Sequence, residues 1–118
     1  MKIQTKKRLL DAFTACQAIE TFVADCTFAD YEQNLMLRSA AERQFEIIGE
    51  ALHQAEIDDP GMTKLLPELR RIVGMRNRII HGYDSVDDEL LWQSIQHNIP
   101  PLRKHLEQIL AEQGNKDT

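Results

Sequence analysis

A chain of 118 residues is long enough for one domain with a modest hydrophobic core and too short for two. We therefore expect a single helical domain over residues 1–112 and a flexible tail over residues 113–118. There is no apolar run of membrane-spanning length, and the basic N-terminal stretch is not followed by the apolar segment of a signal peptide. The two cysteines are too few for a disulfide framework or a zinc site, which indicates free, buried thiols at Cys16 and Cys26 and a cytoplasmic protein.

The formal net charge is −5, but the charge is unevenly distributed along the chain. Residues 62–83 carry five basic side chains against Glu68 alone, whereas the segments before and after them are acidic. A local cluster of positive charge can attract a phosphate even when the whole protein is acidic. Five basic residues predict a local phosphate site and not a long groove along a duplex.

The apolar periodicity is helical in almost the whole chain. In the first predicted helix, about residues 4–26, apolar side chains recur every three or four positions and form one seam. In the second, about residues 32–56, apolar side chains cover two adjacent strips, one through Phe45 and the other through Ile47. So wide an apolar arc in a small domain indicates a central position in a bundle or a subunit interface.

The composition of IDDPGM, residues 57–62, predicts a turn after the second helix. Pro67 suits the first turn of a third helix, about residues 67–81, because a helix does not need the N–H that proline lacks at that position. Gly82 is a suitable stop for this helix.

A fourth helix begins where Ser85 and Asp88 resemble a capping box. Pro100 and Pro101 must interrupt it, so we expect two segments, residues 86–97 and 100–112, with a kink between them. The sequence has no repeat and no strand pattern. It therefore predicts an all-α fold, an antiparallel helical bundle of four to five helices.

The segment RNRIIHGYD, residues 76–84, gathers polar side chains at the end of the third predicted helix. At 100° per residue, Asn77 and His81 share a face, whereas Arg76 lies about 140° from His81 around the axis. An imidazole exchanges protons near neutral pH, and a guanidinium can hold a phosphate. Because RNA carries its own nucleophile, the 2′-OH, these two groups are sufficient for cleavage without a metal.

A purely structural role explains the same residues, because basic groups in a last helical turn interact favourably with its free carbonyls. Glu50 and His53 have the spacing of a four-helix di-metal site, but that architecture needs a second copy of the motif, so we expect no metal and no cofactor. Glu42, Glu46 and Glu50 form a carboxylate stripe that either faces solvent or pairs with arginines.

The stretches AERQFEIIGEAL (41–52) and PELRRIVGMRNRIIHGYDSVDDELLW (67–92) resemble the HepT-like branch of the HEPN superfamily. The resemblance runs from the first helix to about residue 110. It implies a helical bundle that forms a homodimer and an Arg-x4-His-x-Tyr motif, filled here by Arg76, His81 and Tyr83. It also implies a toxin ribonuclease whose antitoxin, a minimal nucleotidyltransferase of the MntA type, adds AMP to the motif tyrosine.

From this resemblance we expect a composite site in a dimer, where Arg76 holds the scissile phosphate and His81 acts as general acid or base. AMPylation of Tyr83 would put bulk and negative charge two residues from the histidine. The other candidate site residues are Asn77 and Arg78 as supporting groups, and Arg70 and Arg71 as phosphate ligands.

Two alternatives remain open at this point. Related HEPN proteins serve as non-catalytic, nucleotide-binding or adaptor subunits that partner a nucleotidyltransferase. In a purely structural dimer, the cluster from Arg70 to Arg78 would instead be closed by ion pairs to Glu42, Glu46 and Glu50.

Overall fold

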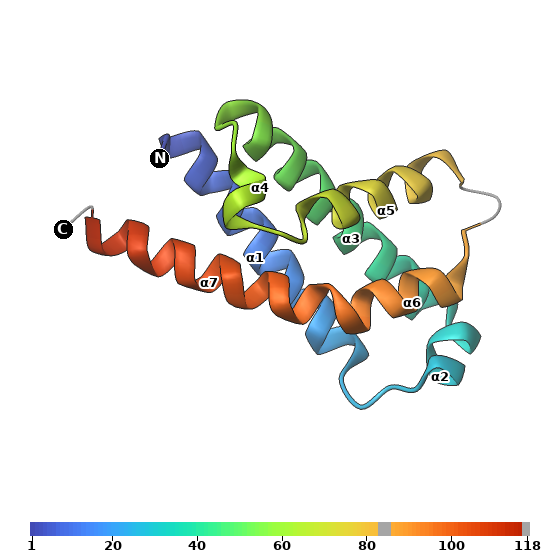
Figure 1. Ribbon diagram of the computed structural model, residues 1–118. Coiled ribbons are helices and arrows are strands. Elements are labelled where there is room, and N and C mark those ends of the chain that lie inside the picture. The colour runs from blue at the N-terminus through green and yellow to red at the C-terminus, as the bar shows by residue number, and fades with distance from the viewer. Residues whose placement is uncertain (83–85, 117–118) are drawn as a thin grey trace.

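The protein is all-helical in the computed structural model, which describes residues 1–82 and 86–116 (Figure 1). No strand occurs within these residues, which confirms the predicted all-α fold. No helix among them is both long and apolar enough to cross a membrane. The helices are α1 (Ile3–Val23), α2 (Phe28–Gln33), α3 (Leu35–Asp58), α4 (Met62–Leu65), α5 (Leu69–His81), α6 (Asp88–His97) and α7 (Ile99–Lys116).

The long helix α1 lies at the centre of the bundle, with α3 along one side and α7 along another (Figure 1). The apolar seam of α1 and the Phe45 strip of α3 meet in this core, where side chains such as Ile19, Phe45 and Leu52 are fully buried. Helix α5 packs on α3, away from α7. Helix α3 is therefore anchored by the core, and α5 is anchored by its packing on α3.

The second predicted helix is α3, which begins at Leu35, three residues later than predicted, and continues to Asp58. Helix α2 was not predicted and lies almost wholly in the stretch expected to connect the first two helices. Asn34, between them, has an extended backbone, and its side chain accepts a hydrogen bond from the Leu37 N–H at 3.1 Å. This N-cap supplies an alternative to a continuing helix, so α3 starts after Asn34 and not at residue 32. A capping box of Thr27 and Asp30 starts α2.

The first helix ends at Val23, three residues before its predicted end. Asp25 follows with a φ of 61°, in the left-handed region that no α-helix continues through. Cys16 is buried as predicted, but Cys26 lies in the connection after the helix and is partly exposed. Both thiols are free, and burial raises the pKa of the Cys16 thiol.

The predicted turn after α3 ends at Gly61, whose φ of 100° favours glycine. The short helix α4 follows, and it was not predicted. Pro67 lies in the turn before α5, which starts at Leu69, two residues later than expected. Gly82 is the C-cap of α5, as predicted.

The break near the two prolines is confirmed, but it lies at Asn98, between α6 and α7. Pro100 and Pro101 both fall in the first turn of α7, where a missing N–H costs nothing. Ser85, the first residue of the predicted capping box, lies outside the described residues. The N-cap of α6 is Asp87, whose side chain accepts from the Leu90 N–H at 3.0 Å.

Candidate functional site

Helix α5 carries most of the predicted site residues and is strongly amphipathic. Its buried side chains, Leu69, Ile72 and Ile79, hold it on the bundle. Most of its exposed side chains are polar, and the functional ones project on two sides of one anchored helix. The exposed residues predicted for the site are Arg70, Arg71, Asn77, Arg78 and His81.

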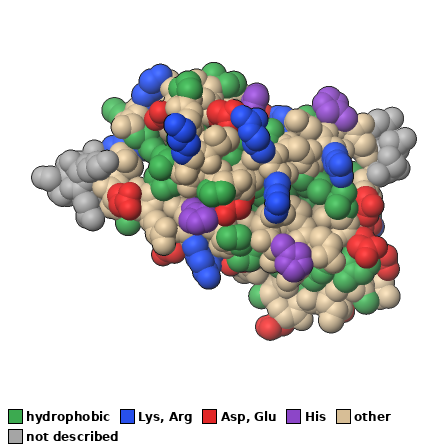
Figure 2. Space-filling model, in the orientation of Figure 1, with side chains coloured by type: hydrophobic (Ala, Val, Ile, Leu, Met, Phe, Trp, Pro, Cys, Tyr) green, Lys and Arg blue, Asp and Glu red, His purple; other side chains and the backbone are tan. Residues whose placement is uncertain are grey.

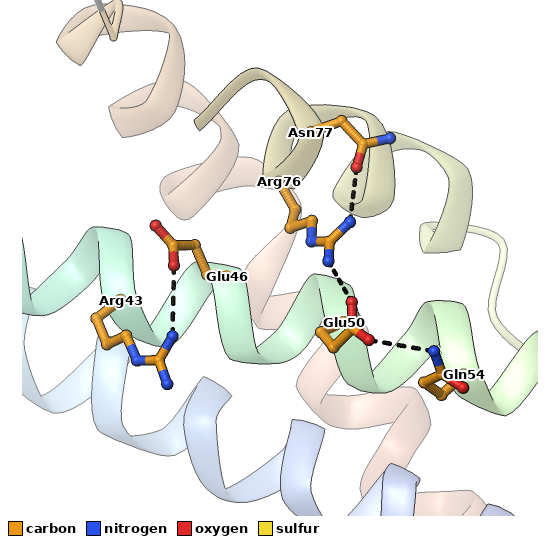
Figure 3. A network of polar contacts seen from close by, with 6 residues as sticks. All are labelled: Arg43, Glu46, Glu50, Gln54, Arg76 and Asn77. Atoms are coloured by element: carbon orange, nitrogen blue, oxygen red, sulfur yellow. Dashed lines mark hydrogen bonds and ion pairs between the residues drawn. The ribbon is translucent and has the colours of Figure 1, made fainter. Parts of the chain in front are cut away.

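The Arg76 side chain points from α5 toward α3 and is held there by two polar groups, one of which is itself held by a third (Figure 3). One terminal nitrogen forms an ion pair with Glu50, and the other donates to the Asn77 Oδ1 at 2.8 Å. The Gln54 amide donates to the second oxygen of Glu50 at 3.1 Å. The Arg76 side chain is 19% exposed, so it is held firmly while its edge stays accessible.

A surface groove of about 560 Å³ passes this guanidinium, and we call it the Arg76 groove. The Nε atom of Arg76 is buried and has no hydrogen-bond partner among the described residues. A phosphate that binds in the groove must share Arg76 with Glu50, which orients the arginine but also competes for it. The lining includes Leu10, Ile47, Glu50, Arg76 and Ile80.

Gly49 makes the position of Arg76 possible. It is buried in α3, and a Cβ added there would overlap the Cβ and Cγ of Arg76. Glycine in a helix interior lowers the stability of the helix by about 1 kcal/mol relative to alanine, so a glycine at such a position indicates that another element packs closely there. We did not predict this role for Gly49 from the sequence. The missing side chain lets α5 approach α3 closely enough for the ion pair with Glu50.

His81 is exposed in the last turn of α5 and lines a different groove, the His81 groove, of about 420 Å³. This groove lies between the end of α5 and the start of α6, and Gly82, Val86 and Asp87 also line it. The Arg76 groove and the His81 groove have no described lining residue in common. A single protomer thus keeps its two principal motif residues on separate surfaces.

The other basic residues of α5 line a third groove, the basic groove, of about 440 Å³. Arg70 lies 3.8 Å from the Glu56 carboxylate. Arg71 and Arg78 have no ion-pair partner among the described residues. The groove is lined by Arg70, Arg71, Gly74, Met75 and Arg78 of α5, by Leu90, Gln93, Ser94 and His97 of α6, and by Asn98.

The carboxylate stripe of α3 divides among three environments. Glu50 binds Arg76, and Glu46 pairs with Arg43 at 3.4 Å (Figure 3). Glu42 is partly buried, and this burial, Asp88 and Glu46 raise its pKa, against the opposing effect of Arg38. Of the three carboxylates, only Glu50 pairs with an arginine of α5 among the described residues, although Glu46 also lines the Arg76 groove, so the fully closed cluster of the structural alternative is not present there.

Two further expectations concern Tyr83 and the Glu50/His53 pair. Tyr83 lies outside the described residues. Glu50 is engaged by Arg76, whereas His53 is exposed and lines another groove. Within the described part of the chain, no three His, Cys, Asp or Glu side chains are grouped so that they could hold a metal ion.

Comparison with known protein families shows to which family the chain belongs. Residues 13–109 match the family model described as Ribonuclease HepT-like. The chain belongs to this family. The HepT-like branch of the HEPN superfamily, which the motif around Arg76 and His81 indicated, is thereby confirmed, and with it membership of a ribonuclease family.

Three relatives illustrate the similarity. This HepT-like chain is 33% identical over 111 residues to the "Probable ribonuclease HepT" of Thermococcus cleftensis, which covers 92% of this chain and 98% of the relative. It is 31% identical over 106 residues to the "Putative RNase MJ1380" of Methanocaldococcus jannaschii, covering 90% and 96% respectively. It is 31% identical over 98 residues to the "Putative RNase TTE0752" of Caldanaerobacter subterraneus subsp. tengcongensis, covering 83% and 87%. No solved structure matches the chain significantly.

The close approach at Gly49 gives a direct test of how Arg76 is placed. We expect Gly49→Ala to lower the free energy of unfolding by about 1–3 kcal/mol, because α5 must move away from α3 to admit the methyl group. Urea unfolding followed by circular dichroism measures this change.

Gly74→Ala is the matched control, since a Cβ there meets nothing within 4 Å. This variant of α5 should gain about 0.4–1 kcal/mol from the reduced entropy of the unfolded chain. If Gly49→Ala stabilises the protein as much as Gly74→Ala does, the two helices are not held together at this point.

Proposed function

We propose that this HepT-like protein is the metal-independent endoribonuclease toxin of a toxin–antitoxin pair, acting as a homodimer on RNA in the cytoplasm. The observation that carries the proposal is the placement of Arg76: a motif arginine of a ribonuclease family, oriented by Glu50 and Asn77 at the edge of an open groove. His81 follows on the same helix, exposed to solvent and available for proton transfer.

The chemistry requires only groups that RNA and these side chains supply. The 2′-oxygen attacks the adjacent phosphorus as its proton leaves, the O2′–P bond forms and the P–O5′ bond breaks, and the leaving 5′-oxygen takes up a proton. The products are a 2′,3′-cyclic phosphate and a 5′-hydroxyl. Arg76 stabilises the charge that develops on the phosphoryl oxygens, and His81 transfers a proton as general acid or base. Asn77 keeps the Arg76 guanidinium in position.

A dimer brings the two motif residues to one site. Because Arg76 and His81 line separate grooves of the protomer, we propose that each active site combines the arginine of one copy with the histidine of the other. The apolar side chains beside Arg76 support an interface on this surface: Leu10 is 52% exposed and Ile80 41% exposed.

Cleavage of total RNA in the presence of EDTA tests the activity. We expect the unmodified wild-type protein to cut RNA and His81→Ala to be slower by about 10²–10⁴-fold, because the proton-transfer group is removed. Gel analysis of the products and circular dichroism of both proteins are the measurements. If His81→Ala loses its helical signal, His81 is structural; if the wild type is inert without AMP on Tyr83, the adaptor function is correct.

The antitoxin is proposed to be an MntA-type nucleotidyltransferase that silences the enzyme at Tyr83. With this partner and ATP, mass spectrometry should find one AMP on the tryptic peptide that contains Tyr83, and RNA cleavage should fall with the extent of modification. The added charge repels the RNA phosphate near His81. Tyr83→Phe should remain unmodified and active. If this variant is labelled as much as the wild type, another residue carries the AMP.

A further inference from the structure

We propose that the basic groove between α5 and α6 binds the backbone phosphates of a single-stranded segment of the RNA and leads that strand to His81. This inference rests on the proposed ribonuclease function and specifies the form of its substrate. It adds a binding surface separate from the Arg76 groove.

The basic groove and the His81 groove adjoin each other. Met75, Arg78 and Leu90 line both of them. From Arg70 to His81 the shared wall is α5, which rises about 1.5 Å per residue and thus spans about 16 Å. In our proposal, a strand that enters beside Arg70 follows α5 through the two adjoining grooves to the histidine.

The basic side chains lie on one stripe of the helix. At 100° per residue, Arg70, Arg71, Arg78 and His81 fall within an arc of about 100°, whereas Arg76 points the other way. On the face drawn in Figure 2, Lys, Arg and His side chains lie over α5 and α6. The positive charge of this segment thus faces one groove and does not surround the helix.

The arginines of the stripe are available to a ligand. Among the described residues, Arg71 and Arg78 have no ion-pair partner. The Arg70 side chain is 77% exposed, and its ion pair with Glu56 is long, at 3.8 Å. No acidic side chain is among the described residues that line the basic groove, and Asp87 appears only at the His81 end. In a protein of net charge −5, this surface is complementary to phosphate.

The lining also indicates how RNA is recognised. No described side chain along the two grooves is Phe, Tyr or Trp, so base stacking is limited to the imidazoles of His81 and His97. Binding then depends on phosphate contacts, which are sensitive to salt and carry little sequence information. The groove lies between two single helices, which suits one strand and not a duplex.

The test measures binding of a fluorescently labelled single-stranded RNA that is 2′-O-methylated throughout and therefore cannot be cut. We expect Arg70→Ala/Arg71→Ala to weaken binding by on the order of tenfold, and the slope of log K against log salt to fall by about 1.4, or 0.7 for each lost phosphate contact. Thermal unfolding should be unchanged, because both side chains are exposed.

Lys7→Ala/Lys104→Ala is the matched control, since it removes the same charge from exposed positions on α1 and α7. This control should keep the wild-type affinity and slope. Equal losses in both double variants, or wild-type binding by the groove variant, would overturn the groove while leaving RNA cleavage intact. A wild type that neither binds nor cuts RNA would contradict the proposed function itself.

Discussion

The ion pair between Arg76 and Glu50 determines how the site is arranged. It forms only because Gly49 lets α5 approach α3 without a side chain between them. The core packing of α3 therefore fixes the position of the motif arginine, through one carboxylate and one glycine. Any change that separates the two helices moves Arg76 relative to the groove that it lines.

The same packing gives α5 two functional sides. Its apolar residues face the bundle, Arg76 faces α3, and the stripe from Arg70 to His81 faces α6. In our account, one side holds the scissile phosphate and the other transfers protons and binds the rest of the strand. Under the proposed mechanism, a single protomer is an incomplete enzyme and dimerisation completes the active site.

The fold was largely predictable because the spacing of apolar residues along the sequence indicates which side of a helix is buried. The helices α1, α3 and α5 each bury one such apolar side. The short helix α2 was not predicted, since local side-chain caps at Thr27 and Asn34 decide where α2 and α3 begin. The angle between Arg76 and His81 followed from helix geometry alone. The pairing of Arg76 with Glu50 does not follow from the geometry of one helix, because it joins residues 26 positions apart and depends on how two helices pack.

The most direct test of the shared site is complementation between two inactive variants. Arg76→Ala and His81→Ala, mixed under conditions that exchange subunits, should recover about a quarter of wild-type cleavage, because half of the dimers are mixed and each mixed dimer holds one complete site of two. Each variant alone should be inactive while remaining helical and dimeric. A mixture of exchanged dimers that stays inactive would contradict an active site built from the arginine of one copy and the histidine of the other.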